Sequence, residues 1–171
     1  MSKRSILAFG FAGFALLALS ALLGAVIPGW AGLARWLTLL GCLLTSLFFY
    51  GYGVAPGAAD DPALRFACWA CMIAPLVSPL LGVLGLTLGA FATVRTIFTA
   101  VSVLAYAWFF FVLYNGWRGK VRQWALATCA AALGLLVFGP VLSVVFLGDV
   151  LAIACYACAT MALFCQHAVT R

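Results

Sequence analysis

The amino-acid sequence predicts an all-α fold: a polytopic transmembrane bundle of about six helices, forming one membrane domain over residues 1–171. Of the 171 residues, 68% are hydrophobic and 7% are charged, whereas a soluble domain has about 25% charged residues. The apolar residues stand in long unbroken runs, without the apolar–polar alternation of a transmembrane β-barrel. Because only a helix satisfies its own backbone hydrogen bonds within such a run, the spans are predicted to be helices.

Turn signals divide the chain into segments of about the 20 residues that a helix needs to cross a bilayer. We expect the spans at residues 5–27, 32–52, 64–86, 93–114, 123–147 and 150–167. The Pro- and Gly-rich segment 53–62 holds two of the three acidic residues and is predicted to be a loop. Gly139-Pro140 is predicted to interrupt the fifth span, and Gly148-Asp149 is predicted to form the tight turn before the sixth.

The basic residues are distributed unequally between the two ends of the predicted bundle. Only Arg35 and Arg95 fall at one end, about one turn inside it, where their side chains are expected to snorkel to the headgroups. The other seven of the nine share the opposite end with both termini: Lys3, Arg4, Arg65, Arg118, Lys120, Arg122 and Arg171. The positive-inside rule therefore predicts cytoplasmic termini, and we expect a bacterial inner membrane. Since topology accounts for the net charge of +6, nucleic-acid binding is not expected.

Aromatic residues cluster toward the ends of the second and fourth predicted spans. The clusters are Phe48, Phe49, Tyr50 and Tyr52, then Trp108, Phe109, Phe110, Phe111, Tyr114 and Trp117. Because aromatic rings settle at the level of the lipid headgroups, we interpret the clusters as an interfacial belt. The clusters and the two arginines also recur at an interval of about 60 residues, which three tandem helical hairpins would explain. The alternative is the general similarity of Leu- and Ala-rich helices.

Residues for catalysis or proton transfer are missing from the predicted spans. No acidic, basic or histidine side chain lies near the middle of a span, where such residues mark proton paths and reaction sites. No nucleophile occurs with a base in a recognisable motif. We therefore expect neither an enzyme, nor a cofactor, nor a proton-driven carrier.

Four of the seven cysteines form a repeated pattern, Ala-Cys-Trp-Ala-Cys at Cys68 and Cys71 and Ala-Cys-Tyr-Ala-Cys at Cys155 and Cys158. Residues three apart share a helix face, so the pairs are candidates for a soft-metal or thiol-exchange site. The two pairs are predicted to differ in depth by roughly 9 Å. Cysteine also packs in lipid as a small apolar residue, and packing is the interpretation that we favour. No metal site is predicted.

Two features predict a candidate ligand or hinge face in the middle of the chain. Pro75 and Pro79 lie four residues apart in the third span, and each removes a backbone hydrogen bond. A proline-broken helix lines the binding cavity of some transporters, although a static bend is the alternative. In the fourth span, Thr99 and Ser102 share a helix face with Tyr106, which is the best candidate for a buried polar contact.

Three functions follow from these observations. Small residues recur at every fourth position in the last two spans, as at Ala154, Cys158 and Ala162, and favour close helix packing. They point to a non-catalytic accessory or structural subunit of a larger membrane complex. The candidate face points to a small carrier or substrate-binding component for a neutral or lipophilic solute, and a cavity there would favour it. The cysteine pairs point to thiol or metal handling. Expected partners are the lipid bilayer and other membrane subunits or a second copy.

Overall fold

The computed structural model describes residues 3–55, 61–84, 89–116, 118–141 and 145–169. These ranges contain six α-helices, one 3₁₀ turn and no strand: α1 (Lys3–Val26), η1 (Pro28–Trp30), α2 (Ala31–Val54), α3 (Pro62–Val83), α4 (Ala90–Gly116), α5 (Gly119–Val141) and α6 (Val145–Val169). All six helices are long and apolar enough to cross a membrane. The predicted fold class is confirmed: the chain has the fold of an all-α integral membrane protein.

The turn between the last two helices differs from the prediction. Gly148 and Asp149 lie inside α6, which begins at Val145, so the turn predicted at these residues is wrong. Helix α5 ends at Val141, directly after the Gly139-Pro140 pair. Proline lacks the N–H of a helical hydrogen bond and glycine weakens a helix, so the pair is a weak point near the described end of α5, and residues 145–147 of the predicted fifth span belong to α6. The predicted end of the third span, at residue 86, lies outside the described residues.

Local signals in the sequence account for two of the helix starts. The Asp61 carboxylate accepts hydrogen bonds from the backbone N–H groups of Ala63 and Leu64, at 2.9 and 3.2 Å, and so caps α3. Pro62 follows at the first helical position, where its missing N–H costs nothing. Gly119 begins α5 with a φ of 65°, a conformation that a residue with a Cβ rarely adopts.

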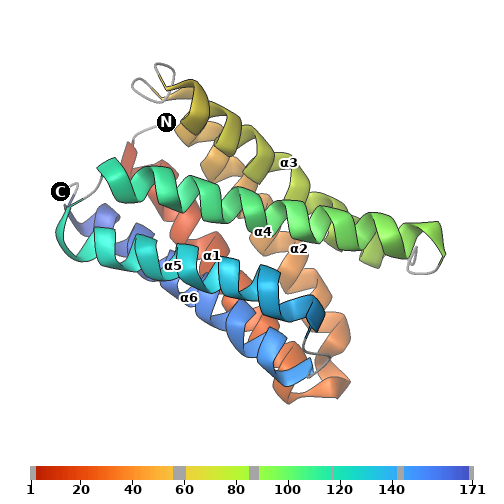
Figure 1. The fold of residues 1–171 in the computed structure, drawn as a ribbon. Helices are drawn as coiled ribbons and strands as arrows, with labels where there is room; N and C mark the ends of the chain where they lie inside the picture. Colours follow the sequence, from red (N-terminus) through yellow and green to blue (C-terminus); the bar gives the residue numbers. More distant parts are fainter. Residues whose placement is uncertain (1–2, 56–60, 85–88, 117, 142–144, 170–171) are drawn as a thin grey trace.

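The six helices close into a ring (Figure 1). Each helix packs against its neighbours in the sequence, and α6 packs against α1. Within the described residues, no Cα atom lies within 8 Å of a Cα atom on a helix across the ring. The end of the ring that carries the start of α1 and the end of α6 is called the termini end here, and the opposite end, near Arg35 and Arg95, is the arginine end. Side chains alone fill the space along the ring axis.

The outer surface of the ring is apolar. On α2 the exposed large side chains follow one another at intervals of three or four residues: Leu33, Trp36, Leu40, Leu43 and Leu47. Helix α4 shows the same pattern at Ile97, Val101, Leu104, Trp108 and Phe111. Residues at this spacing lie on one face of a helix. Helices α2 and α4 therefore each present one apolar stripe to the outside, as contact with lipid requires.

The space along the ring axis is filled toward the termini end by an aromatic core, defined as Phe14, Phe48, Phe49, Phe109 and Phe110. The last four are each 0% exposed. The rings of Phe49 and Phe109, on α2 and α4, have centroids 4.8 Å apart. Phe14 on α1 lies 5.9 Å from Phe110 on α4. These contacts bridge helices whose backbones do not touch, because only wide side chains span the gap.

The predicted interfacial belt is therefore wrong for four of its members, Phe48, Phe49, Phe109 and Phe110. They lie in the interior of the ring and contact one another. Other members lie on the outer surface, where Tyr50, Trp108 and Phe111 are exposed. Trp117 lies outside the described residues. The termini end of α2 and α4 thus has one aromatic face toward the ring axis and another toward the surroundings.

Small residues set the closest helix contacts. A Cβ on Gly13 would lie 2.7 Å from Cγ2 of Thr45 and 2.8 Å from its backbone nitrogen, so α1 and α2 cross with no room for a side chain. In α5 and α6 the small residues Ala125, Ala132 and Ala159 are fully buried. This part of the small-residue pattern thus serves packing within the bundle.

Candidate functional site

A cavity of about 90 Å³ lies along the ring axis beyond the aromatic core, toward the arginine end. Its lining includes all five residues of the candidate face, Pro75, Pro79, Thr99, Ser102 and Tyr106. The remaining wall is formed by Leu17 on α1, Thr38 and Cys42 on α2, Ser78 on α3, Val103 on α4 and Tyr156 on α6. The structure thus brings residues of five helices around one small space.

Tyr106 forms the polar floor of this cavity. The residue is 3% exposed, and its ring lies 5.4 Å from Phe14 and 5.9 Å from Phe49. The neighbouring Thr45 hydroxyl donates to the Cys42 carbonyl at 3.0 Å. Among the residues that the structure describes, the Tyr106 phenol has no hydrogen-bond partner. A buried hydroxyl without a partner costs about 1–3 kcal/mol, so a group that completes this bond would be stabilised here.

Most of the other hydroxyls around the cavity have their protons occupied. Thr38, Thr99 and Ser102 each donate to the backbone carbonyl four residues earlier in their own helix, at 2.9, 2.8 and 2.6 Å. The Ser78 and Thr99 hydroxyl oxygens lie 3.4 Å apart, and because the one Thr99 proton is donated to the Arg95 carbonyl, Ser78 can donate its own proton to Thr99. The Tyr156 phenol also lines the cavity, so the hydroxyl protons with no acceptor among the described residues are those of Tyr106 and Tyr156, with the weaker thiol donor of Cys42.

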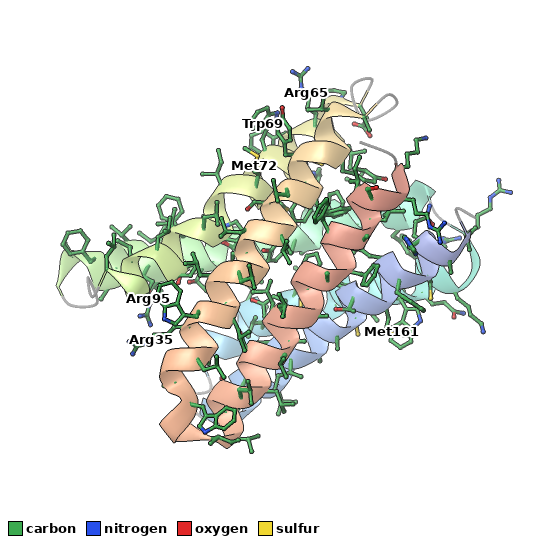
Figure 2. All side chains as sticks on the ribbon, turned by 180° about the vertical axis from the view of Figure 1, so that it is seen from behind. Arg35, Arg65, Trp69, Met72, Arg95 and Met161 are labelled. Atoms are coloured by element: carbon green, nitrogen blue, oxygen red, sulfur yellow. The ribbon has the colours of Figure 1, made fainter. Side chains whose placement is uncertain are left out.

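A second cavity, of about 130 Å³, adjoins the first at the arginine end. Thr38, Ser78 and Pro79 line both, and Gly82 lines the second. Arg35 on α2 and Arg95 on α4 complete its wall, and Figure 2 shows the two side chains next to each other. Two guanidinium groups from opposite sides of α3 thus meet at one opening. We call the two adjoining spaces together the ring cavity.

The two prolines of α3 face the ring cavity without ending the helix, which continues through both from Pro62 to Val83. Proline has no N–H, so the carbonyls four residues before Pro75 and Pro79 lose their usual donor. In the same stretch the Ser46 hydroxyl of α2 donates to the Met72 carbonyl at 2.8 Å. This side-chain bond ties α2 to α3 within one turn of Pro75, and the sequence alone did not single it out.

Sequence reasoning found the polar stripe of α4 but missed the matching stripe of α2. On α2, Arg35, Thr38 and Cys42 follow one another at helical spacing and all reach the ring cavity. The signal was present, since the same interval on α4 runs from Arg95 through Ser102. The sequence predicted that Arg35 and Arg95 lie at the headgroups. They reach one opening because α2 and α4 both pack against α3.

The structure does not bring the two cysteine pairs together. Cys68 and Cys71 pack in the cluster that contains the aromatic core, whereas Cys155 packs with Cys129 in a second cluster. Helices α3 and α6 have no backbone contact in the described ranges. All seven cysteines are free thiols, and no three His, Cys, Asp or Glu residues gather as a metal site within these ranges.

Comparisons with protein-family models, with curated proteins and with solved structures find no match to this chain.

Proposed function

We propose that this protein is a non-catalytic membrane protein that binds a small solute in the ring cavity, as a carrier or as a substrate-binding component. The observation that carries the proposal is the buried Tyr106 hydroxyl, which has no hydrogen-bond partner among the described residues and belongs to a residue that lines the cavity. Buried polar groups are normally hydrogen-bonded. A ligand atom that accepts from this phenol would complete the site.

The shape of the ring interior supports binding from one end. The two adjoining cavities lead from Arg35 and Arg95 to Tyr106. Beyond Tyr106 the interior is filled by the aromatic core, whose rings are in contact with one another. A solute that enters at the arginine end therefore stops at the phenol. Release toward the termini end would require the aromatic rings to move, as in the closed gate of a carrier.

Charge distribution supports an orientation in the membrane. The described basic residues of the termini end are Lys3, Arg4, Arg65, Arg118, Lys120 and Arg122. By the positive-inside rule, we place both termini in the cytoplasm and the protein in a bacterial inner membrane. The ring cavity then opens to the outside of the cell membrane, so the solute is one that the cell meets there.

Solute binding is preferred over the role of accessory subunit because of where the small residues lie. Ala125, Ala132, Ala159 and Ala162 are fully buried inside the bundle, which leaves less of the small-residue pattern to bind another subunit. A membrane subunit would still co-purify with fixed partners in mild detergent. Isolation from native membranes, followed by mass spectrometry of proteins and small molecules together, compares the two functions directly.

The decisive variant fills the cavity with Ser102→Phe and is compared with the wild type and with Leu104→Phe. Ser102 is 6% exposed and lines the cavity, whereas Leu104, on the outer face of the same helix, is 48% exposed. The wild type and Leu104→Phe are expected to release one small molecule per protein on denaturation, and Ser102→Phe is expected to release at least about tenfold less. If the wild type releases no more than Ser102→Phe, the proposal is wrong.

A further inference from the structure

The ring cavity offers hydrogen-bonding groups at three depths and a positive charge at one of them. Arg35 and Arg95 line the opening, Ser78 lies where the two cavities meet, and Tyr106 lies at the floor. Arginine has only donors, and the Tyr106 proton has no acceptor among the described residues. A ligand that fits this arrangement presents an acceptor at its inner end and a negative charge at its outer end.

The two arginines are not neutralised within the described part of the chain. No ion pair or hydrogen bond joins either guanidinium to another side chain there. Asp61 caps α3 at the termini end, and Asp149 lies on α6, whose backbone contacts neither α2 nor α4 in the described ranges. Two like charges at one opening repel each other, and more strongly at the edge of a bilayer than in water. An anion between them would turn this repulsion into attraction.

The volumes limit the size of such an anion. An apolar cavity of about 150 Å³ accommodates benzene, so the outer cavity of about 130 Å³ holds roughly five non-hydrogen atoms and the inner cavity of about 90 Å³ roughly four. Arg95 and Tyr106 are separated by about 16 Å along α4, and both long side chains lean toward its N-terminal end. By volume, a body of about nine non-hydrogen atoms fills the two cavities between them.

We infer that the solute is an oxyanion, a carboxylate or phosphate ester, whose charged head lies between Arg35 and Arg95 and whose short uncharged tail ends in an acceptor for Tyr106. The planar guanidinium groups bind two oxygens of such a head at once. The inference rests on the proposed function and replaces the neutral solute of the sequence-based hypothesis with a charged one. Because both arginines lie at the end of the bundle, the head belongs either to a free solute or to an anionic lipid.

The test uses three probes that share a six-carbon body and a terminal hydroxyl and differ in head charge: 6-hydroxyhexanoate, 1,6-hexanediol and 6-amino-1-hexanol. Dissociation constants are measured by saturation-transfer NMR on the purified full chain in an uncharged detergent at fixed ionic strength, because salt screens the arginines. The anion is expected to bind at least about tenfold more tightly than the diol, and the amine more weakly than the diol.

Substitutions test which residues cause the difference in affinity between the probes. Arg35→Gln and Arg95→Gln are each expected to weaken anion binding about tenfold and to leave diol binding within about twofold. Arg65→Gln, an exposed arginine at the termini end, is the matched control and is expected to change neither. Tyr106→Phe is expected to weaken all three probes about equally, roughly fivefold, because the tail loses its donor.

The outcomes separate the two proposals. If the diol binds as tightly as the anion and the arginine variants have no effect, the charge inference is overturned while solute binding stands. If no probe depends on Tyr106, both are overturned. Competition by phosphatidylglycerol in nanodiscs, with phosphatidylcholine nanodiscs as the control, tests whether the anionic head belongs to a lipid or to a free solute. Competition by phosphatidylglycerol alone supports an anionic lipid, and its absence, with binding of 6-hydroxyhexanoate retained, supports a free oxyanion.

Discussion

Helices α2 and α4 each run through two regions of the ring that are built in opposite ways. In their first halves both present a basic and polar stripe to the ring axis, Arg35 to Cys42 on α2 and Arg95 to Ser102 on α4, and a cavity remains between them. In their second halves both present phenylalanines, and the axis is filled. The ring axis therefore holds a cavity where small hydroxyl side chains line it and a core where phenylalanine rings fill it.

In a six-helix ring without backbone contacts across it, side-chain size along the axis controls where a cavity can remain. Close packing in a protein interior normally leaves few spaces larger than a water molecule. Here Phe14, Phe49 and Phe110 are wide enough to meet across the axis. Thr38, Ser78 and Ser102 are not, and they leave a space lined with hydroxyls. The aromatic region holds the ring together, and the arginine region is free to bind.

The largest effect is expected from removing a ring in the aromatic region. Phe109→Ala deletes a side chain that is 0% exposed and contacts Phe48, Phe49 and Phe110. The variant should lose about 3 kcal/mol of unfolding free energy, the lower end for a buried phenylalanine because lipid is itself apolar. The free energy is measured by denaturation in mixed micelles. Phe111→Ala, on the exposed face of α4, should lose less than about 0.5 kcal/mol. Equal losses would mean that the aromatic core does not hold the ring.

A smaller loss of unfolding free energy is expected from a substitution at the point where α1 and α2 cross. In Gly13→Ala the new methyl group would lie 2.8 Å from the backbone nitrogen of Thr45, which cannot move without the helix. Overpacking of this kind costs about 1–3 kcal/mol and should separate α1 from α2, which also widens the ring cavity. Gly24→Ala in the same helix meets nothing within 4 Å and should be neutral or stabilising. Thermal unfolding of both variants in detergent compares them, and equal behaviour would contradict the tight crossing.

The smallest effect on stability is expected from adding volume to the cavity. Ser102→Val places a methyl group toward existing space, whereas Ala105→Val, one turn further along α4, places it in the main core cluster. The first change should alter the unfolding free energy by less than about 0.5 kcal/mol, and the second should cost about 1–3 kcal/mol. If Ser102→Val is as costly as Ala105→Val, the space beside Ser102 is not available to a ligand.

Residue spacing along single helices predicted part of the candidate site. Helical spacing by itself predicts that Thr99, Ser102 and Tyr106 share one face of α4, and that face lines the cavity. The prolines of α3 were selected for their missing N–H groups, and they also line it. The partner stripe on α2 was missed, because periodicity within one helix does not say which other helix it faces.

The fold class and the approximate helices follow from the long apolar runs, because such runs satisfy their backbone in lipid only as helices. Which apolar side chains face inward depends on how the helices pack against one another. In a membrane the exterior is as apolar as the interior, so hydrophobicity could not distinguish the buried Phe109 and Phe110 from the exposed Trp108 and Phe111. Ring closure between α6 and α1, and the meeting of Arg35 with Arg95, likewise depend on contacts between segments far apart in the chain.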